Sequence, residues 1–291
     1  MMKIPSESGS NARSSVVGRQ KIERLMHLTR RANIIALVDH PSHVDDLSAA
    51  AVAFGTKLNV MVEVDIGLGR CGVQPGKPTV DLARYVTSKG SLQFKGLSGH
   101  EASAGIADRS ERIPRQRENF QRLVDSRADV ERAGMAVDIC GGGATAAWNV
   151  AGTMDGITEI EPGAYVVMDY GMKYNAPDLE FDLALKVLST IISRPTDDRA
   201  VVDCGHKMIG LAYDGKMPGM LAPSGASVTR LNSEHGILHL SDEARALRIG
   251  DKVELIPWYY GTAVNANDHY VGVRNGIVEC TWRIAARGAH Q

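Results

Sequence analysis

The alternation of two kinds of segment along residues 16–178 constrains the fold of this chain most. Short runs that are apolar throughout, such as NIIALVD and NVMVEVDIG, alternate with segments that repeat apolar residues at helical spacing. The helix predicted from Arg19, for example, places Ile22, Leu25 and Met26 on one face. Strands that are apolar along their whole length are typical of a parallel sheet covered on both faces. The alternation therefore predicts an α/β fold, either a β/α barrel or a doubly wound sheet.

The number of strands limits this choice further. Residues 16–178 hold only about five or six strand-like runs, whereas a closed β/α barrel has eight strands. A barrel that lacks two or three strands keeps unpaired edges and an open core. We therefore expect an incomplete barrel.

The two ends of the chain have a different character. Residues 1–15 are polar, serine-rich and without periodicity, which indicates a disordered lead-in. Residues 179–291 contain short strand-like runs separated by turns, and Asn275-Gly276 between HYVGVR and IVECTW is a strong hairpin signal. A mostly antiparallel β domain is expected there.

Composition excludes several classes of protein. With 33 basic and 34 acidic residues the formal net charge is -1, which excludes a polybasic nucleic-acid binder. No apolar run approaches the roughly 20 residues of a membrane span, and the first residues have no secretory apolar core. The four scattered cysteines form no CxxC pair, so a reduced, cytoplasmic protein without structural zinc is the simplest expectation.

Two glycine-rich segments follow predicted strands and are candidate ligand sites. EVDIGLGRCGVQPG carries Arg70, a permanent cation suited to an anionic or aromatic ligand, although a plain turn with a surface arginine is the more common explanation. ICGGGATAAW combines a triple glycine with Thr145 and a helix-like segment, which together suit a phosphate. A structural glycine turn explains that segment equally well.

Three further segments gather polar side chains. His100 and Glu101 follow the strand in GLSGHEASAG, where a structural histidine is at least as common as a catalytic one. Ser233, Glu234 and His235 lie together in LNSEHGIL, and IPWYYGTAVNANDHYVGV gathers aromatic, Asn, Asp and His residues. Ordinary loop solvation and aromatic packing are the alternatives.

Taken in order, EVDIGLGRCGVQPG, GLSGHEASAG, TEIEPGAYVVMD, NSEHG, DKVELIP and YVGVRNGIVECTWRIAARG resemble the D-serine dehydratase-like and low-specificity D-threonine aldolase family. The resemblance runs from about Val16 to the C-terminus. It implies an alanine racemase-type β/α barrel, incomplete here, followed by a mostly antiparallel β domain. It also implies a fold type III pyridoxal 5'-phosphate enzyme that forms homodimers and acts on a small D-amino acid.

The same resemblance implies roles for individual residues. Arg70 would lie near the cofactor ring, and the phosphate would be held by Gly142, Gly143 and Thr145. Tyr165 is a further candidate for the pocket. The two candidate catalytic residues are His100, which stands where family members commonly have Tyr in GYE-type motifs, and His235 of the SEHG element.

Two departures from the family pattern shape the functional expectation. The family's Schiff-base lysine lies in a PHxKTHK-like motif on the first barrel strand, and no such motif occurs in this sequence. The metal-binding positions of the β domain fall on Tyr259 and Gly261, which are poor ligands. We therefore expect neither covalent attachment of the cofactor nor a family-type divalent metal site.

Three functional hypotheses remain at this stage. The chain is a lyase of D-3-hydroxy amino acids, by aldol cleavage or dehydration, that is impaired because the N-terminal segment with the lysine is missing. Alternatively, it is a non-catalytic remnant that binds the cofactor or an amino acid. In the third hypothesis it is a diverged racemase-type or decarboxylase-type enzyme with a new base such as His100. An in-frame PHxKTHK segment in the upstream DNA would favour the first over the second.

Overall fold

A computed structural model describes residues 10–12, 15–101, 103, 105–212 and 215–289 of the chain. The chain divides into two compact units, residues 1–163 and residues 164–291. The sequence-based boundary near residue 178 therefore lies later than the boundary between these units. Each unit is described by itself.

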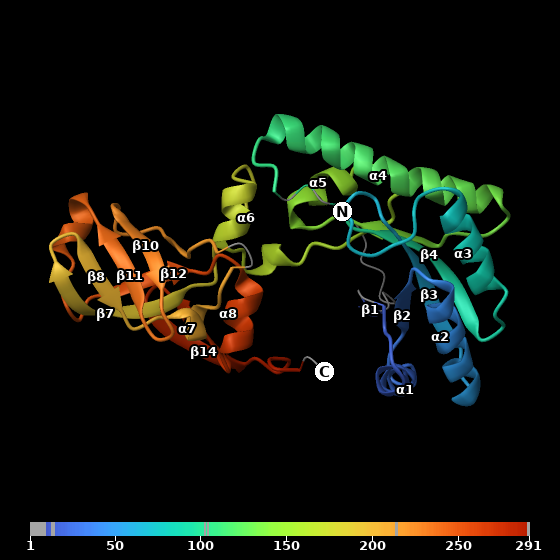
Figure 1. The fold of residues 1–291 in the computed structure, drawn as a ribbon, viewed down its shortest axis with the longest axis horizontal. Helices are drawn as coiled ribbons and strands as arrows, with labels where there is room; N and C mark the ends of the chain where they lie inside the picture. The colour runs from blue at the N-terminus through green and yellow to red at the C-terminus, as the bar shows by residue number, and fades with distance from the viewer. Residues whose placement is uncertain (1–9, 13–14, 102, 104, 213–214, 290–291) are drawn as a thin grey trace. The chain divides into compact units, whose positions relative to one another are not determined.

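The first unit is built on a parallel sheet (Figure 1). Among the described residues this sheet has six strands, which pair strictly in chain order. Its members are β1 (Ser10–Ala12), β2 (Ile34–Val38), β3 (Leu58–Val64), β4 (Leu92–Gly99), β5 (Ile139–Gly142) and β6 (Glu159–Ile160). The order leaves β1 and β6 on the outside, and it confirms the prediction of an incomplete barrel-like α/β unit.

Strand β1 lies within residues 1–15, for which the sequence predicts a disordered lead-in; residues 1–9, 13 and 14 of that stretch lie outside the described residues. Ser10, Asn11 and Ala12 pair in parallel with the beginning of β2. Periodicity of apolar residues could not reveal a strand of three residues with such side chains. An outer strand of this kind joins the sheet through backbone hydrogen bonds, which do not depend on an apolar pattern.

Helices cover the sheet of the first unit. They are α1 (Arg19–Leu28), α2 (Pro41–Ala53), α3 (Lys77–Thr87), α4 (Arg109–Arg132) and α5 (Trp148–Ala151). The covered face of the sheet carries Val38, Val62 and Leu97, which belong to one buried cluster with Leu47 and Phe120 of the helices. The apolar strand runs in the sequence therefore predicted the core correctly. The opposite face has a smaller buried cluster, with Ile35, Leu37 and Met61.

The second unit contains a six-stranded sheet whose hydrogen-bonded order is β10-β11-β8-β7-β12-β9 among the described residues. Its strands are β7 (Val187–Thr196), β8 (Arg199–Val202), β9 (Gly219–Met220), β10 (Ala226–Leu231), β11 (Gly236–Leu240) and β12 (Lys252–Ile256). All the pairings in this sheet are antiparallel, as predicted for the β domain.

A separate hairpin and three short helices complete the second unit. The hairpin consists of β13 (His269–Arg274) and β14 (Ile277–Arg283), and both Asn275 and Gly276 have positive φ, so the predicted Asn-Gly turn is confirmed. The helices are α6 (Tyr170–Asn175), α7 (His206–Ile209) and α8 (Tyr260–Ala266). In the described part of the chain, no helix has the length and apolar character that a membrane crossing requires.

Candidate functional site

The C-terminal ends of the parallel strands form one edge of the sheet in the first unit, which we call the strand-end edge. Parallel α/β folds commonly place their ligand sites at this edge. The residues that immediately follow β2, β3, β4, β5 and β6 are Asp39, Asp65, His100, Gly143 and Glu161. Of the residues predicted from the sequence, the topology assigns Arg70, His100, Gly142, Gly143 and Thr145 to this edge.

The turn after β5 is tightly packed against its neighbours. A Cβ atom on Gly142 would lie 2.6 Å from the carbonyl oxygen of Gly99, so only glycine allows β4 and β5 to approach this closely. Gly143 has φ +89°, and a Cβ atom there would lie 2.6 Å from the Cβ of Ala151. The chain then enters the short 3-10 helix η1 (Thr145–Ala147) with Thr145 buried. Close packing therefore explains why glycine occupies positions 142 and 143, in addition to the predicted role of these residues in phosphate binding.

Glu101 reaches this turn from the end of β4. The residue is 2% exposed, and the backbone N–H of Ala144 lies close enough to its carboxylate to lower its pKa. The hydroxyl of Ser103 lies 3.4 Å from Oε1, whereas the buried Oε2 has no hydrogen-bond partner in the structure. Burial raises the pKa of Glu101, and its own backbone N–H, the N–H of Ala144 and the hydroxyl of Ser103 oppose that rise.

Helix α4 supports the same turn from the other side. Gln116, which is completely buried, donates from Nε2 to the carbonyl oxygen of Ala146 over 2.8 Å. Its Oε1 is buried without a partner in the structure. A buried polar side chain of α4 therefore holds Ala146, just after the turn.

A second group of charges surrounds the end of β3. A guanidinium nitrogen of Arg70 lies 3.6 Å from Oε1 of Glu63, whose side chain is only 6% exposed. Burial raises the pKa of Glu63, the charge of Arg70 lowers it, and the charges of Asp39 and Asp65 raise it further. Oε2 of Glu63 is buried and lacks a hydrogen-bond partner in the structure, so it is an acceptor facing the interior.

The loop that carries Arg70 is fixed by carboxylates. Asp65 Oδ1 accepts the N–H groups of Gly67 and Gly69 at 3.0 Å each. Asp39 Oδ2 accepts the N–H of Gly72, also at 3.0 Å. These bonds explain why a glycine-rich loop can hold an arginine at a defined place.

Sequence reasoning missed the pair of Asp39 and His43. The Nδ1 atom of His43 lies 3.0 Å from Oδ1 of Asp39, and both side chains are about one-fifth exposed at 20% and 19%. Asp39 follows β2 directly and His43 is in the first turn of α2. The position of Asp39 after an apolar strand was the signal that could have identified the pair.

The lysines of the first unit lie elsewhere. Lys77 begins α3 and pairs with Asp81, and Lys89 pairs with Asp45. Lys95 lies within β4 and contacts Asp138, which precedes β5. None of the described lysines of this unit lies in a loop that leads from the C-terminal end of a sheet strand into the next helix.

The second unit holds the other two predicted site residues. Tyr165 is in the short 3-10 helix η2 (Ala164–Val166), is 45% exposed and packs beside the ring of Phe181. His235 is exposed in the turn between β10 and β11, where its carbonyl oxygen accepts the N–H of Asn232. The neighbouring Glu234 forms an ion pair with Lys207.

The segment that corresponds to the family's metal motif is an aromatic cluster. Trp258 is 7% exposed and packs against Tyr170 and Tyr174 at ring-centre distances of 5.9 and 5.3 Å. Asp169 accepts the N–H of Tyr260 at 3.0 Å and caps α6 through the N–H of Met172. Within the described residues there is no cluster of three or more His, Cys, Asp or Glu side chains suited to a metal ion. These residues do not fit a family-type metal site.

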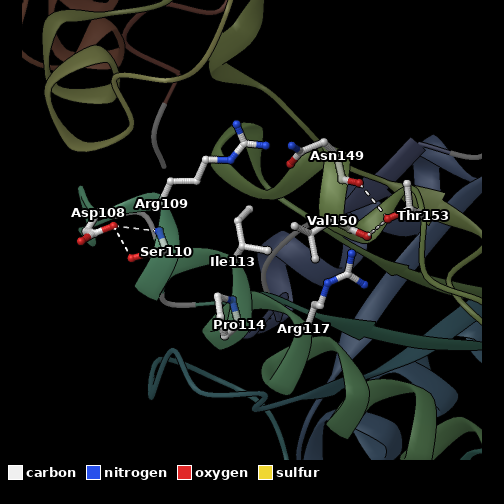
Figure 2. Close-up of a pocket in the computed structure, with 9 residues that line it drawn as sticks. All are labelled: Asp108, Arg109, Ser110, Ile113, Pro114, Arg117, Asn149, Val150 and Thr153. Atoms are coloured by element: carbon white, nitrogen blue, oxygen red, sulfur yellow. Dashed lines mark hydrogen bonds between the residues drawn. The ribbon is translucent and has the colours of Figure 1, made fainter.

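An open groove of about 850 Å³ lies on the outer helix layer of the first unit (Figure 2). Figure 2 shows Arg109 and Arg117 extending from α4 on either side of Ile113, with Asn149 of α5 opposite. The buried Gln116 of the same helix supports the turn after β5 instead. The lining of the groove comes from Asp108 before α4, from α4 itself, and from α5 and the residues after it.

Comparison with known proteins identifies the class of this fold and site. The family model for the alanine racemase N-terminal domain matches residues 5–171, and that for a putative serine dehydratase domain matches residues 184–273. The chain belongs to the alanine racemase-fold family that includes D-threonine aldolase and the D-serine dehydratase-like enzymes.

Individual relatives agree with this assignment. A D-threonine aldolase from Arthrobacter sp is 33% identical over 279 residues, which cover 94% of this chain and 73% of the relative. A 3-hydroxy-D-aspartate aldolase from Paracoccus denitrificans is 31% identical over 280 residues, or 92% of this chain and 70% of the relative. The crystal structure of D-threonine aldolase from Filomicrobium marinum superposes with a TM-score of 0.91 at 31% identity, covering 96% of this chain and 76% of that one.

Proposed function

We propose that the chain binds pyridoxal 5'-phosphate and acts as a lyase on D-3-hydroxy amino acids, by aldol cleavage or dehydration. Relatives named D-threonine aldolase, 3-hydroxy-D-aspartate aldolase and D-threo-3-hydroxyaspartate dehydratase support this substrate class. The observation that carries the proposal is the strand-end edge, where the glycine turn after β5 and the pair of Arg70 and Glu63 at the end of β3 lie on either side of β4.

The residues at this edge fit the cofactor. The backbone N–H groups of the turn from Gly142 to Thr145, together with the hydroxyl of Thr145, supply donors of the kind that hold a phosphate. The buried, unpartnered Oε2 of Glu63 is an acceptor for a protonated ring atom or ring hydroxyl, and Arg70 adds a cation beside it. When bound, pyridoxal phosphate supplies an electron sink for bond cleavage at Cα of an amino acid.

We assign proton transfer to histidine side chains at the strand-end edge. Aldol cleavage requires removal of the proton of the β-hydroxyl, and dehydration requires delivery of a proton to the leaving hydroxyl. We propose His100 for this role, as the sequence suggests, with His43 as a second candidate because its ring lies beside the carboxylate of Asp39. His235 remains a proposed contributor from the second unit.

Turnover is expected to be slow. A lysine speeds loading of the cofactor and exchange with the substrate amine, and the described lysines of the first unit lie away from the edge. The family's metal-ligand positions are occupied by Tyr259 and Gly261. This arrangement also favours a second candidate function, in which the chain binds cofactor or amino acid without turning it over.

Stereospecific consumption of substrate distinguishes these functions. Purified protein with pyridoxal phosphate is incubated with D-threonine or D-threo-3-hydroxyaspartate, and glycine, aldehyde, keto acid and ammonia are quantified. Consumption of the D-isomer above the rate with pyridoxal phosphate alone, and absent for the L-isomer, supports the lyase. Equal rates with and without protein refute it, and saturable binding of the cofactor without turnover then assigns the binding function. Racemisation of D-alanine would assign the racemase-type alternative.

We also propose that the chain forms a homodimer, and the hairpin of β13 and β14 supports this. Among the described residues these strands pair only with each other, and isolated two-stranded hairpins are marginally stable in water. The hairpin nevertheless exposes large apolar side chains, with Val273 60%, Ile277 68% and Val278 60% accessible. Sedimentation velocity is expected to show a dimer that Val273→Glu with Val278→Glu converts to a monomer. A monomeric wild type at micromolar concentration would refute this proposal.

The expected location is the cytoplasm, with no nucleic-acid or membrane partner. Cys71, Cys140, Cys204 and Cys280 are all free thiols, which a reducing compartment would preserve. Fractionation of cells that express the chain at natural level tests this location.

A further inference from the structure

The loop that follows β3 closes on itself at the strand-end edge. After β3 the chain returns to this strand at Val73, which forms a parallel bridge with Val64. The N–H of Asp65 donates to the carbonyl oxygen of Val73, and the N–H of Val73 donates to that of Glu63, each over 2.9 Å. Arg70 therefore lies in a closed loop whose two ends are fixed to β3.

Two carboxylates bind this loop on either side of Arg70. Asp65, within the loop, accepts the N–H of Gly69 over 3.0 Å. Asp39, which directly follows the neighbouring strand β2, accepts the N–H of Gly72, also over 3.0 Å. The backbone is thus held before the arginine from within the loop and after the arginine from β2.

The Asp39 carboxylate has polar neighbours at both of its oxygens. Its Oδ1 lies 3.0 Å from Nδ1 of His43 and 3.5 Å from Oγ of Ser15, whereas Oδ2 accepts the N–H of Gly72. The Asp39 side chain is only 19% exposed, and a carboxylate acceptor makes a stronger hydrogen bond than a neutral one. The bond to Gly72 is therefore a firm attachment of the loop.

The Arg70 side chain depends on this attachment for its position. It is 54% exposed, so packing against neighbouring side chains restricts it little. A guanidinium nitrogen nevertheless lies 3.6 Å from the largely buried carboxylate of Glu63. The direction of the arginine is therefore set mainly by the backbone that carries it.

From this geometry we infer that Asp39 is a positioning residue for Arg70: by holding the N–H of Gly72, it keeps the guanidinium beside Glu63, where the cofactor ring is proposed to bind. The inference rests on the proposed cofactor function. Asp39 acts on the ring through Arg70. Its removal is therefore expected to weaken ligands that carry the ring and to spare inorganic phosphate.

A double-mutant cycle tests whether Asp39 and Arg70 act as one unit. Quenching of tryptophan fluorescence measures binding of pyridoxal phosphate to the wild type, Asp39→Ala, Arg70→Ala and the double variant. Each single substitution is expected to weaken binding about tenfold, the effect of one lost hydrogen bond to a charged group. The double variant is expected to bind no more weakly than Arg70→Ala. Inorganic phosphate, measured by competition, should bind all variants within about twofold of the wild type.

Further variants separate this role from a merely structural one. Asp39→Asn keeps an oxygen that can accept the Gly72 N–H and is expected to stay within about threefold of the wild type. Asp46→Ala removes an exposed carboxylate of α2 and, as the matched control, is expected to leave both affinities unchanged. Hydrogen exchange of the Gly72 amide, measured without ligand, should be about tenfold faster in Asp39→Ala and unchanged in Asp46→Ala. Circular dichroism establishes which variants fold, and Asp39→Ser carries the test if Asp39→Ala does not.

The outcomes distinguish this inference from the proposed function. Losses that multiply in the double variant, or wild-type affinity for pyridoxal phosphate in a folded Asp39→Ala or Arg70→Ala, would overturn the inference alone. An equal loss in Asp39→Asn and Asp39→Ala would also overturn it, because Asp39 would then act through its charge and not through the Gly72 N–H. A wild type that binds neither pyridoxal phosphate nor inorganic phosphate would refute the proposed function and the inference together.

Discussion

Substitution of Gly143 by alanine tests how closely the turn after β5 is packed. Gly143 has φ +89° and its added Cβ would lie 2.6 Å from the Cβ of Ala151. Gly134, after α4, has a similar φ of +84° but nothing within 4 Å of its added Cβ. Backbone strain at positive φ costs an alanine about 1–2 kcal/mol at either position. Overpacking adds about 1–3 kcal/mol at Gly143 only, so Gly143→Ala is expected to destabilise the first unit by about 2–5 kcal/mol.

Urea unfolding of the first unit measures this difference. Of the three tryptophans in the chain, Trp148 lies in α5 next to the turn, so replacement of Trp258 and Trp282 by phenylalanine leaves one reporter for this unit. The Gly143→Ala and Gly134→Ala variants are compared in that background. If both variants lose the same free energy of unfolding, the turn does not pack against α5 as closely as we describe.

Three further predictions follow from individual contacts. Burial raises the pKa of Glu101 above its ordinary 4.5. The folded protein therefore binds the proton of this carboxyl group more tightly than the unfolded chain does. The contribution of Glu101 to stability falls as the pH rises through and beyond 4.5. Glu101→Gln should therefore gain stability relative to wild type between about pH 4 and pH 7 in urea unfolding, and a constant difference would contradict the assignment. Asp169→Ala removes the acceptor of the Met172 and Tyr260 N–H groups and should lower the free energy of unfolding of the second unit by about 2–3 kcal/mol. Trp258 fluorescence measures this unfolding. A loss below about 0.5 kcal/mol would argue against Asp169 as the acceptor for both N–H groups. Borohydride reduction of protein loaded with pyridoxal phosphate should leave no lysine labelled in one-to-one ratio, and a single stoichiometric labelled peptide in mass spectrometry would show that a lysine reaches the site.

The sequence predicted the main strands and helices because their apolar patterns are long. The runs that became β2 and β3 are buried along nearly their whole length, so periodicity identified them directly. Strand β1 has three residues and no such pattern. Residues 164–178 lack periodicity too, and they join the second unit through contacts such as that of Asp169 with Tyr260, 91 residues further on. Contacts between residues this far apart leave no local signal.

The candidate site was predictable only in part, for a related reason. A glycine run after a strand marks a turn, so Gly142, Gly143 and Thr145 stood out from the sequence. That Glu101 lies opposite Ala144 depends on the register between β4 and β5, which side-chain patterns do not encode. The pair of Asp39 and His43 depends on where α2 begins, because residues four apart come together where the chain is helical and lie far apart where it is extended.

Among the described residues β1 and β6 are the outer strands of this sheet, which makes it suitable for protein complementation. Each outer strand offers a row of backbone donors and acceptors that an added parallel strand can join. A synthetic strand–helix segment fused ahead of residue 10 would enter beside β1 while the pairing of β2 to β6 stays as it is. A lysine at the C-terminal end of the added strand would then lie at the same edge of the sheet as Arg70 and Thr145. The sheet is therefore suited to the design of a covalent attachment site for the cofactor.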